Sequence, residues 1–149
     1  MDEKIKDLEK ARIELKKVID EFPEGRREEI LFDKWSLKDT LSHFSGWNML
    51  RVQQIKDFLV GNPVTWLEDW DGFNWENVNS RRSKTYDEVY AEFVKSMDDV
   101  IKGFQSIPQD MVENPWWPGH PYNALSSIQT DIGHWRDDHL PGIRSQILS

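Results

Sequence analysis

Apolar residues recur at spacings of three and four in four long segments of this 149-residue chain. Such spacing places them on one face of an α-helix, and no segment shows the strict alternation typical of a half-buried strand. The four segments cover about residues 2–22, 36–61, 85–104 and 123–147. The pattern therefore predicts an all-α protein with four helices, folded as a single domain over residues 1–149.

Residues with known capping preferences bound these helices. Ser36 is a suitable N-cap, and Asp39 follows three residues later, which indicates a near capping box at the start of the second helix. Thr85 and Glu88 form a similar pattern at the third helix. Gly61 is placed to end the second helix.

The connections 62–84 and 108–122 are long and rich in aromatic residues, whereas flexible linkers are polar and rich in Gly and Ser. We expect both connections to fold over the helices, where they either plug one end or cover a cleft. Their indoles should then be largely buried, because a soluble monomer seldom exposes a large apolar patch. A homodimer is a second way to bury them. The indoles concerned are Trp66, Trp70, Trp116 and Trp117.

Composition excludes several classes of site and partner. The chain has no cysteine, which rules out disulfides, thiolate metal sites and a cysteine nucleophile. Its formal net charge is −8, and its Lys and Arg clusters are short, so we expect no binding to nucleic acid or to an anionic membrane. No segment resembles a signal peptide or a transmembrane helix. We therefore expect a soluble, cytoplasmic protein.

Three of the four histidines fall in the second and fourth helical segments. His43 lies early in the second segment, and His134 and His139 lie in the fourth. Imidazole is the commonest side-chain metal ligand and the usual acid or base near neutral pH. A histidine of one helix that faces two histidines of another can form a small polar site inside a helical bundle.

The sequence around these histidines resembles the DinB-like family of four-helix bundles. Residues 35–44, Trp-Ser-Leu-Lys-Asp-Thr-Leu-Ser-His-Phe, are similar to the start of the second helix in that family, and residues 138–143, Asp-His-Leu-Pro-Gly-Ile, are similar to its last helix. Residues 74–82 also resemble the branch named after DfsB and ClbS. The resemblance implies a DinB-like four-helix bundle with long aromatic-rich connecting loops.

The resemblance also implies a candidate metal site, since many DinB-like proteins bind a divalent metal through one histidine of the second helix and two of the last, four residues apart. His43 and His139 match two of these positions, but the third is Trp135, which cannot bind a metal. His134 is five residues before His139 and points about 140° away from it on a regular α-helix. Pro141 removes a helical hydrogen bond and can distort this turn. We therefore expect His43, His134 and His139 to form a degenerate site with weak or no Zn²⁺ or Ni²⁺ binding.

Other roles for these side chains stay open. His139 also fits a core histidine that is hydrogen-bonded to a backbone or carboxylate group, and His134 fits a surface residue paired with Asp138. Asp131 and Asp138 could supply oxygen ligands, because they flank the same region.

Three further residues are candidates for the wall of a ligand pocket. Trp47 lies one turn after His43, and Trp135 lies one turn before His139. Asn48 interrupts the apolar face of the second helix beside Trp47. Pockets are mostly apolar with a few convergent polar groups, which favours these three as ligand-binding residues. Packing in the core is the alternative for both indoles.

Three functions fit these observations. The first is a small-molecule enzyme, for which the resemblance implies a hydrolase or a thiol-dependent transferase; His43 and His139 would be the catalytic residues, in a cleft between the second and fourth helices. The second is a protein that binds or sequesters a small ligand without turnover. The third is a helical homodimer with a structural role.

Overall fold

The computed structural model describes residues 1–148, and the chain is all-α, as the apolar pattern predicts. Within these residues the backbone forms no β-strand, only two isolated bridges. Short 3-10 turns, η1 (Glu24–Arg26) and η2 (Gln109–Met111), lie in the connections. The helices, in chain order, are α1 (Asp2–Asp20), α2 (Leu37–Val60), α3 (Trp70–Asn79), α4 (Tyr86–Gln105), α5 (Ala124–Gly133), the π-helix η3 (His134–Asp138) and α6 (Leu140–Leu148).

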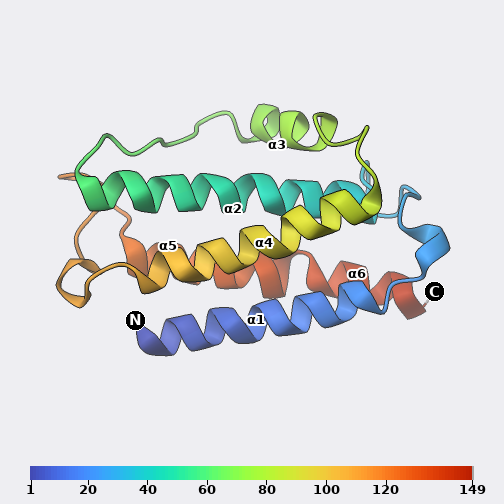
Figure 1. Cartoon of the computed structure of the whole chain (residues 1–149), viewed down its shortest axis with the longest axis horizontal. Helices are drawn as coiled ribbons and strands as arrows, with labels where there is room; N and C mark the ends of the chain where they lie inside the picture. Colours follow the sequence, from blue (N-terminus) through green and yellow to red (C-terminus); the bar gives the residue numbers. More distant parts are fainter. Residues whose placement is uncertain (149) are drawn as a thin grey trace.

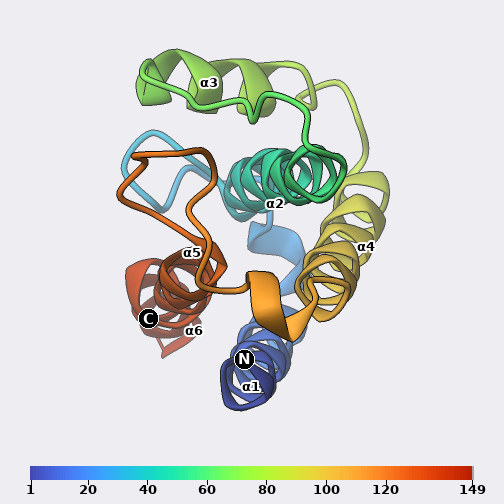
Figure 2. The same ribbon diagram turned by 90° about the vertical axis from the view of Figure 1, so that its left-hand side faces the viewer.

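The long helices lie side by side (Figure 1). The helix α1 and the C-terminal stretch α5–α6 run in one direction, and α2 and α4 run in the other. Seen along the helices, α2, α4, α1 and α5 follow one another around a common axis (Figure 2). Because α5–α6 is antiparallel to α2, the beginning of α2 lies opposite the end of the α5–η3 stretch. The helix α3 lies on the outer side of α2, on the segment that returns the chain to the start of α4.

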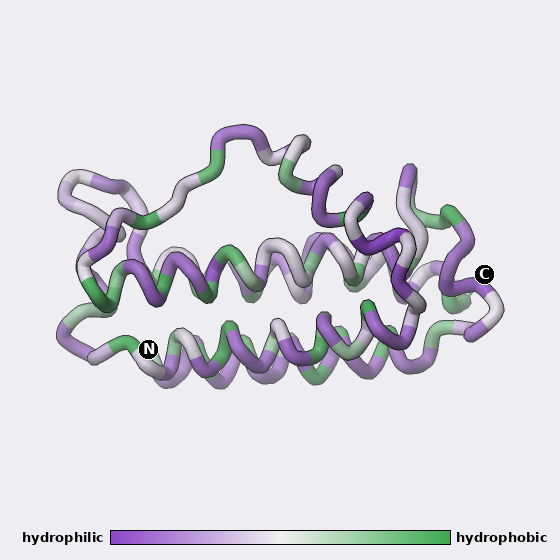
Figure 3. Tube along the Cα trace, turned by 45° about the horizontal axis from the view of Figure 1, so that its top comes forward, coloured by the Kyte–Doolittle hydropathy of each residue, from purple (hydrophilic) through white to green (hydrophobic). Residues whose placement is uncertain are grey.

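One hydrophobic core fills the space between these helices. Each long helix contributes an apolar stripe, visible as alternating colours along the tube in Figure 3. Burial of a side chain such as Leu8 or Phe93 stabilises the fold by about 1.5–3 kcal/mol, and both are completely buried. This packing holds α2 and α5 in place, so it also fixes the polar side chains that face each other from them. None of the helices within residues 1–148 has the length and apolarity needed to cross a membrane.

The helix ends confirm most of the capping analysis. Ser36 Oγ accepts a hydrogen bond from Asp39 N at 3.1 Å, and the Asp39 carboxylate accepts one from Ser36 N at 3.1 Å. Thr85 caps α4 by accepting from Glu88 N at 3.2 Å. Gly61 ends α2 in the left-handed conformation, with φ of 75°, which costs glycine little.

Three features differ from the prediction. The first helix ends at Asp20, two residues earlier than expected. The connection 62–84 contains α3, which Asp69 caps by accepting from Gly72 N at 2.9 Å. This helix is short and buries only Val78, so its sequence carries no apolar stripe. The fourth segment is not one continuous α-helix, because η3 interrupts it.

The prediction that four loop indoles are largely buried is correct for Trp116, which is 3% exposed, and wrong for Trp70, which is 62% exposed. It is also wrong for Trp66 and Trp117, which are 39% and 38% exposed. These two pack on each other instead of on the core, with ring centroids 5.9 Å apart. This edge-to-face contact, with an interplanar angle of 82°, shields part of each ring while the rest stays in contact with solvent.

Candidate functional site

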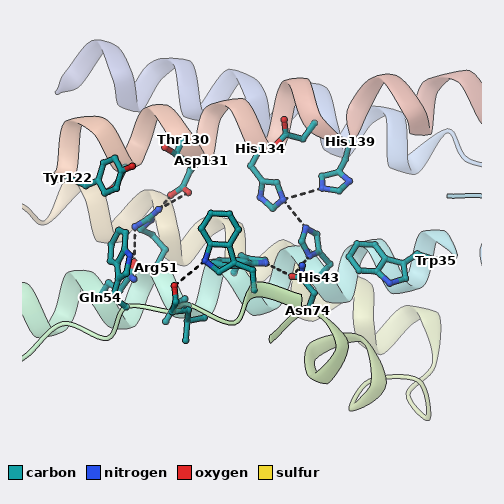
Figure 4. Close-up of a pocket in the computed structure, with 17 residues that line it drawn as sticks. Trp35, His43, Arg51, Gln54, Asn74, Tyr122, Thr130, Asp131, His134 and His139 are labelled. Atoms are coloured by element: carbon teal, nitrogen blue, oxygen red, sulfur yellow. Dashed lines mark hydrogen bonds and ion pairs between the residues drawn. The ribbon is translucent and has the colours of Figure 1, made fainter. Parts of the chain in front are cut away.

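A cleft with a volume of about 580 Å³ lies between α2 and the α5–η3 stretch (Figure 4). This volume is typical of sites for small molecules. Both expected catalytic residues, His43 and His139, line it. Indoles form much of its wall. The lining residues are Trp35, His43, Trp47, Leu50, Arg51, Gln54, Trp66, Leu67, Trp70, Asn74, Tyr122, Ser127, Thr130, Asp131, His134, Asp138 and His139.

Three imidazoles converge at one end of the cleft. His43 Nε2 lies 2.9 Å from His134 Nε2, and His139 Nε2 lies 3.2 Å from the same atom. The expectation that His134 points away from His139 and pairs with Asp138 on the surface is therefore wrong. His134 instead faces both other histidines from the inner side of the helix (Figure 4).

The π-helix η3 explains this difference. In a π-helix the backbone hydrogen bonds join residues five apart, so the side chains of His134 and His139 come to lie one above the other. Pro141 has no N–H to continue a regular α-helix through this stretch, and it sits in the first turn of the new helix α6, where proline is tolerated. Residues five apart lie on different faces of an α-helix, but they lie on the same face of this π-helix.

Asn74, on α3, fixes the orientation of the His43 ring. The indole N–H of Trp47 can only donate, and it lies 2.6 Å from Asn74 Oδ1, so this atom is the amide oxygen. His43 Nδ1, 3.0 Å from the same oxygen, must then carry the proton and donate it. The Nε2 atom of neutral His43 is left with a lone pair directed at the histidine cluster.

Burial keeps all three imidazoles neutral. The pKa of His43 is lowered to about 4, chiefly by burial and then by His139, against the opposing effect of the hydrogen bond to Asn74. Burial, followed by the proximity of His43 and His139, places the pKa of His134 well below its usual value. Burial also lowers the pKa of His139, although the nearby Asp138 carboxylate opposes this. Neutral imidazole is the form that binds metals.

The donor set fits a divalent cation. Nitrogen atoms bound about 2.05 Å from a metal lie roughly 2.9–3.4 Å apart at octahedral or tetrahedral angles, and both measured separations fall within this range. One ligand atom from each of the three residues lies within 4.8 Å of the others. Without a cation, the single proton of His134 Nε2 cannot satisfy both neighbours. Three protein ligands leave coordination positions open for a substrate.

The two carboxylates proposed as oxygen ligands differ in position. Asp131 pairs with Arg51, whose Nε lies 2.9 Å from Asp131 Oδ2. Burial raises the pKa of Asp131, although the Arg51 guanidinium opposes this. Asp138 is exposed at the edge of the cleft beside His139, and no Lys or Arg of residues 1–148 pairs with it. Asp138 is therefore the carboxylate that is free to interact with a bound molecule.

Two of the three candidate ligand-binding residues lie in the core. Trp135 is completely buried and Asn48 is 3% exposed, and neither lines the cleft. They contact each other, with Trp135 Nε1 donating to Asn48 Oδ1 at 3.3 Å, while the amide nitrogen of Asn48 donates to Ser96 at 3.0 Å. The polar Asn48 therefore interrupts the apolar stripe to satisfy a buried indole. Trp47 does line the cleft.

Asn74 and Arg51 are site residues that the sequence analysis did not single out. Asn74 lies in the segment that resembles the DfsB and ClbS branch, and Arg51 breaks the apolar face of its helix. A charged residue on an otherwise apolar face is a usable sign of a buried polar partner. Nothing local in the sequence indicates that Asn74 contacts His43.

An aromatic cluster stands over the far end of the cleft. Trp66 stacks on Tyr122 with ring centroids 5.7 Å apart, and His120 lies between Trp66 and Trp117, at 4.4 and 3.8 Å from their centroids. The cluster joins the connection before α3 to the connection before α5. His120 thus belongs to this aromatic cluster and not to the group of His43, His134 and His139.

No family model matches this chain, and no curated protein or solved structure matches it.

Proposed function

We propose that this chain is a DinB-like four-helix bundle that acts as a metal-dependent enzyme on a small molecule, with His43, His134 and His139 as the metal ligands. The observation that carries the proposal is the convergence of three neutral imidazoles on one side of a cleft large enough for a small molecule. The resemblance of the motifs around His43 and His139 supports the same function.

A divalent metal held there supplies Lewis acidity at its open coordination positions. Other residues of the chain orient the ligands, limit the access of water and accept a proton. Asn74 holds the His43 ring through Nδ1, and this kind of hydrogen bond orients an imidazole ligand and raises its basicity. Trp35 packs on His43 with ring centroids 4.8 Å apart and limits the access of water. Asp138, at the edge of the cleft beside His139, accepts the proton that a reacting group loses.

Hydrolysis fits this set of residues best. It is assisted by a base that accepts a proton from water, and the carboxylate of Asp138 can take this role. A thiol-dependent transfer would need a thiol from a second substrate, because the chain contains no cysteine. The resemblance to the DfsB and ClbS branch, which is similar to hydrolases, points in the same direction.

Titration with Co²⁺ tests the metal site and its open position together. We expect one equivalent to bind and to give visible absorption bands typical of nitrogen ligation, and we expect added azide or acetohydroxamate to shift those bands. A bound metal whose spectrum neither anion changes would be a closed, structural site, which contradicts an enzyme. The absence of stoichiometric binding would remove the proposal.

A matched pair of variants assigns the ligands. His139→Ala should abolish the Co²⁺ spectrum, because only two imidazoles remain. His120→Ala, which removes a histidine of the aromatic cluster, should leave it unchanged. Equal effects of both variants would mean that Co²⁺ binds nonspecifically to surface histidines.

A second candidate function is sequestration of a ligand without turnover. The observation in its favour is the set of indoles that line the cleft and remain partly exposed, since aromatic surface binds flat molecules without any metal. It predicts that small aromatic probes bind equally well with and without Zn²⁺, and that the loaded protein shows no hydrolase activity against chromogenic esters or amides.

A further inference from the structure

The cleft has a second polar end, opposite the histidines. There Arg51 of α2 bridges to Asp131 of α5 across the cleft (Figure 4). Arg51 Nε donates to Asp131 Oδ2 at 2.9 Å, and Arg51 Nη2 donates to Asp131 Oδ1 at 3.3 Å. Arg51 Nη1 donates to Gln54 Oε1 at 2.7 Å, and Gln54 Nε2 donates to the Thr65 carbonyl at 2.8 Å. This chain of bonds holds the end of the cleft in one geometry.

This end is polar but carries no net charge. Arginine stays protonated in proteins, and the carboxylate of Asp131 balances it. The guanidinium has five N–H groups, so some of them remain free after the bonds to Asp131 and Gln54. The carboxylate likewise retains lone pairs, and Thr130 and Tyr122 add hydroxyl groups to the same part of the lining. The matching group on a ligand is uncharged and both donates and accepts hydrogen bonds.

An apolar wall separates the two polar ends. His43, Trp47 and Arg51 are four residues apart in succession, so they share one face of α2 with the indole in the middle. The two ends are therefore about 12 Å apart along α2. Leu50, Trp66, Leu67 and Trp70 extend the apolar wall around this middle part.

We propose that the Arg51–Asp131 end is a subsite for an uncharged amide-type group, such as a carboxamide, urea or lactam, carried on a flat apolar body whose other end reaches the histidines. This inference rests on the proposed function, since it names the class of molecule that the same cleft takes. Asp131 is the residue that determines specificity. Arg51 alone would attract a carboxylate, and the charge of Asp131 repels one.

A pair of probes of equal shape tests this specificity. We would measure the binding of 3-phenylpropionamide and 3-phenylpropionate to the full chain, with and without one equivalent of Zn²⁺. The wild-type protein without Zn²⁺ should bind the amide at least about tenfold more tightly than the carboxylate, because the charged probe would lie beside the carboxylate of Asp131. Failure of the wild-type protein to bind the amide at millimolar concentration would overturn the inference.

Asp131→Asn should shift the preference toward the carboxylate by about tenfold or more, whether or not Zn²⁺ is present. Any attraction of the carboxylate to the metal is common to both proteins and cancels in this comparison. Asp138→Asn is the matched control, because it removes the same charge from the lining at the histidine end. Equal shifts in the two variants would show a general charge effect and overturn the subsite.

Asp131→Asn leaves a buried guanidinium without its partner and can fail to fold. The double variant Arg51→Gln with Asp131→Asn keeps hydrogen-bonding groups and removes both charges. It should bind the amide within about threefold of the wild-type protein, and it should not gain affinity for the carboxylate. A gain in carboxylate affinity by this uncharged variant would contradict the assignment.

The two proposals fail separately. If the wild-type protein does not bind Co²⁺, the metal-dependent function is contradicted, and the preference between the two probes can still be measured. Normal Co²⁺ spectra in the Asp131 variants, with no difference between the two probes, would defeat the subsite alone.

Discussion

The Nδ1 atom of His43 and the side-chain oxygen of Asn74 lie 3.0 Å apart, although they belong to helices on different layers of the molecule. The contact joins α3 to the histidine cluster. Its effect on the ring of His43 can be measured by removing the amide.

Asn74→Leu should weaken Zn²⁺ or Co²⁺ binding by about 10–100-fold, which is typical when the hydrogen-bond partner of a ligating histidine is lost. Competition with a chromogenic chelator measures this change. Asn79→Leu is the control, because Asn79 is an exposed amide on the same helix. If the two variants bind metal equally, Asn74 does not orient His43.

The metal-free protein should lose stability as the pH falls from 6.5 toward 4. The pKa of His43 is about 4 in the folded protein and 6.5 when unperturbed, so between these values the unfolded state binds a proton that the folded state does not. The stability from neutral His43 is complete above pH 6.5, and the loss is on the order of 3 kcal/mol by pH 4. Urea unfolding at several pH values measures it.

His43→Gln should reduce this dependence between pH 6.5 and 5, and His120→Ala should not. Burial also lowers the pKa values of His134 and His139, which account for the dependence that remains. A pH profile of His43→Gln that matches the wild-type profile would place the titration elsewhere.

Trp116→Ala should destabilise the fold by about 3–5 kcal/mol. The indole is buried, donates to Ser127 Oγ at 3.0 Å and packs on Phe58 with ring centroids 5.1 Å apart. Trp75→Ala should have little effect, because Trp75 is 65% exposed. Thermal melts of the two variants provide the comparison, and equal melting temperatures would contradict the packing described for Trp116.

Gly46→Ala should disturb the packing of α3 on α2. A Cβ at this position would lie 2.1 Å from Asn77 Cγ, and Asn77 cannot move away without losing its bonds to the Phe73 carbonyl and to Arg81. Overpacking of this kind costs about 1–3 kcal/mol.

Gly142→Ala is the matched control for Gly46→Ala, since Gly142 is helical and has open space around it. This substitution should stabilise the helix by about 0.5–1 kcal/mol. Urea unfolding measures the change in the free energy of unfolding for both variants. If Gly46→Ala stabilises the protein, α3 is free to shift.

Local features of the sequence were sufficient to predict the all-α class and the positions of the long helices. Ser36 and Gly61 bound α2 as expected because a cap acts within a few residues of its own position. The core stripes follow from periodicity alone. The helix α3 was not predicted because it buries only Val78 and so has no apolar stripe. Its position depends on contacts such as that of Gly46 with Asn77, which are distant in the sequence.

The candidate site was predictable only in part. His43 and His139 were identified from their motifs, and both line the cleft. The place of His134 depends on a change of helix type that regular α-helical geometry does not contain. Asn48 was expected to meet a ligand, but a polar residue on an apolar face can equally serve a buried partner, here Trp135.

The π-helix has a consequence for how this site tolerates changes in chain length. A π-turn accommodates one more residue than an α-turn while the helix beyond it keeps its course. Deletion of one residue between His134 and His139 would leave them four apart on a continuous α-helix, still on one face. The two imidazoles therefore stay on one face of the helix when one residue of this stretch is lost. With the two histidines five residues apart, Trp135, four residues before His139, is buried in the core.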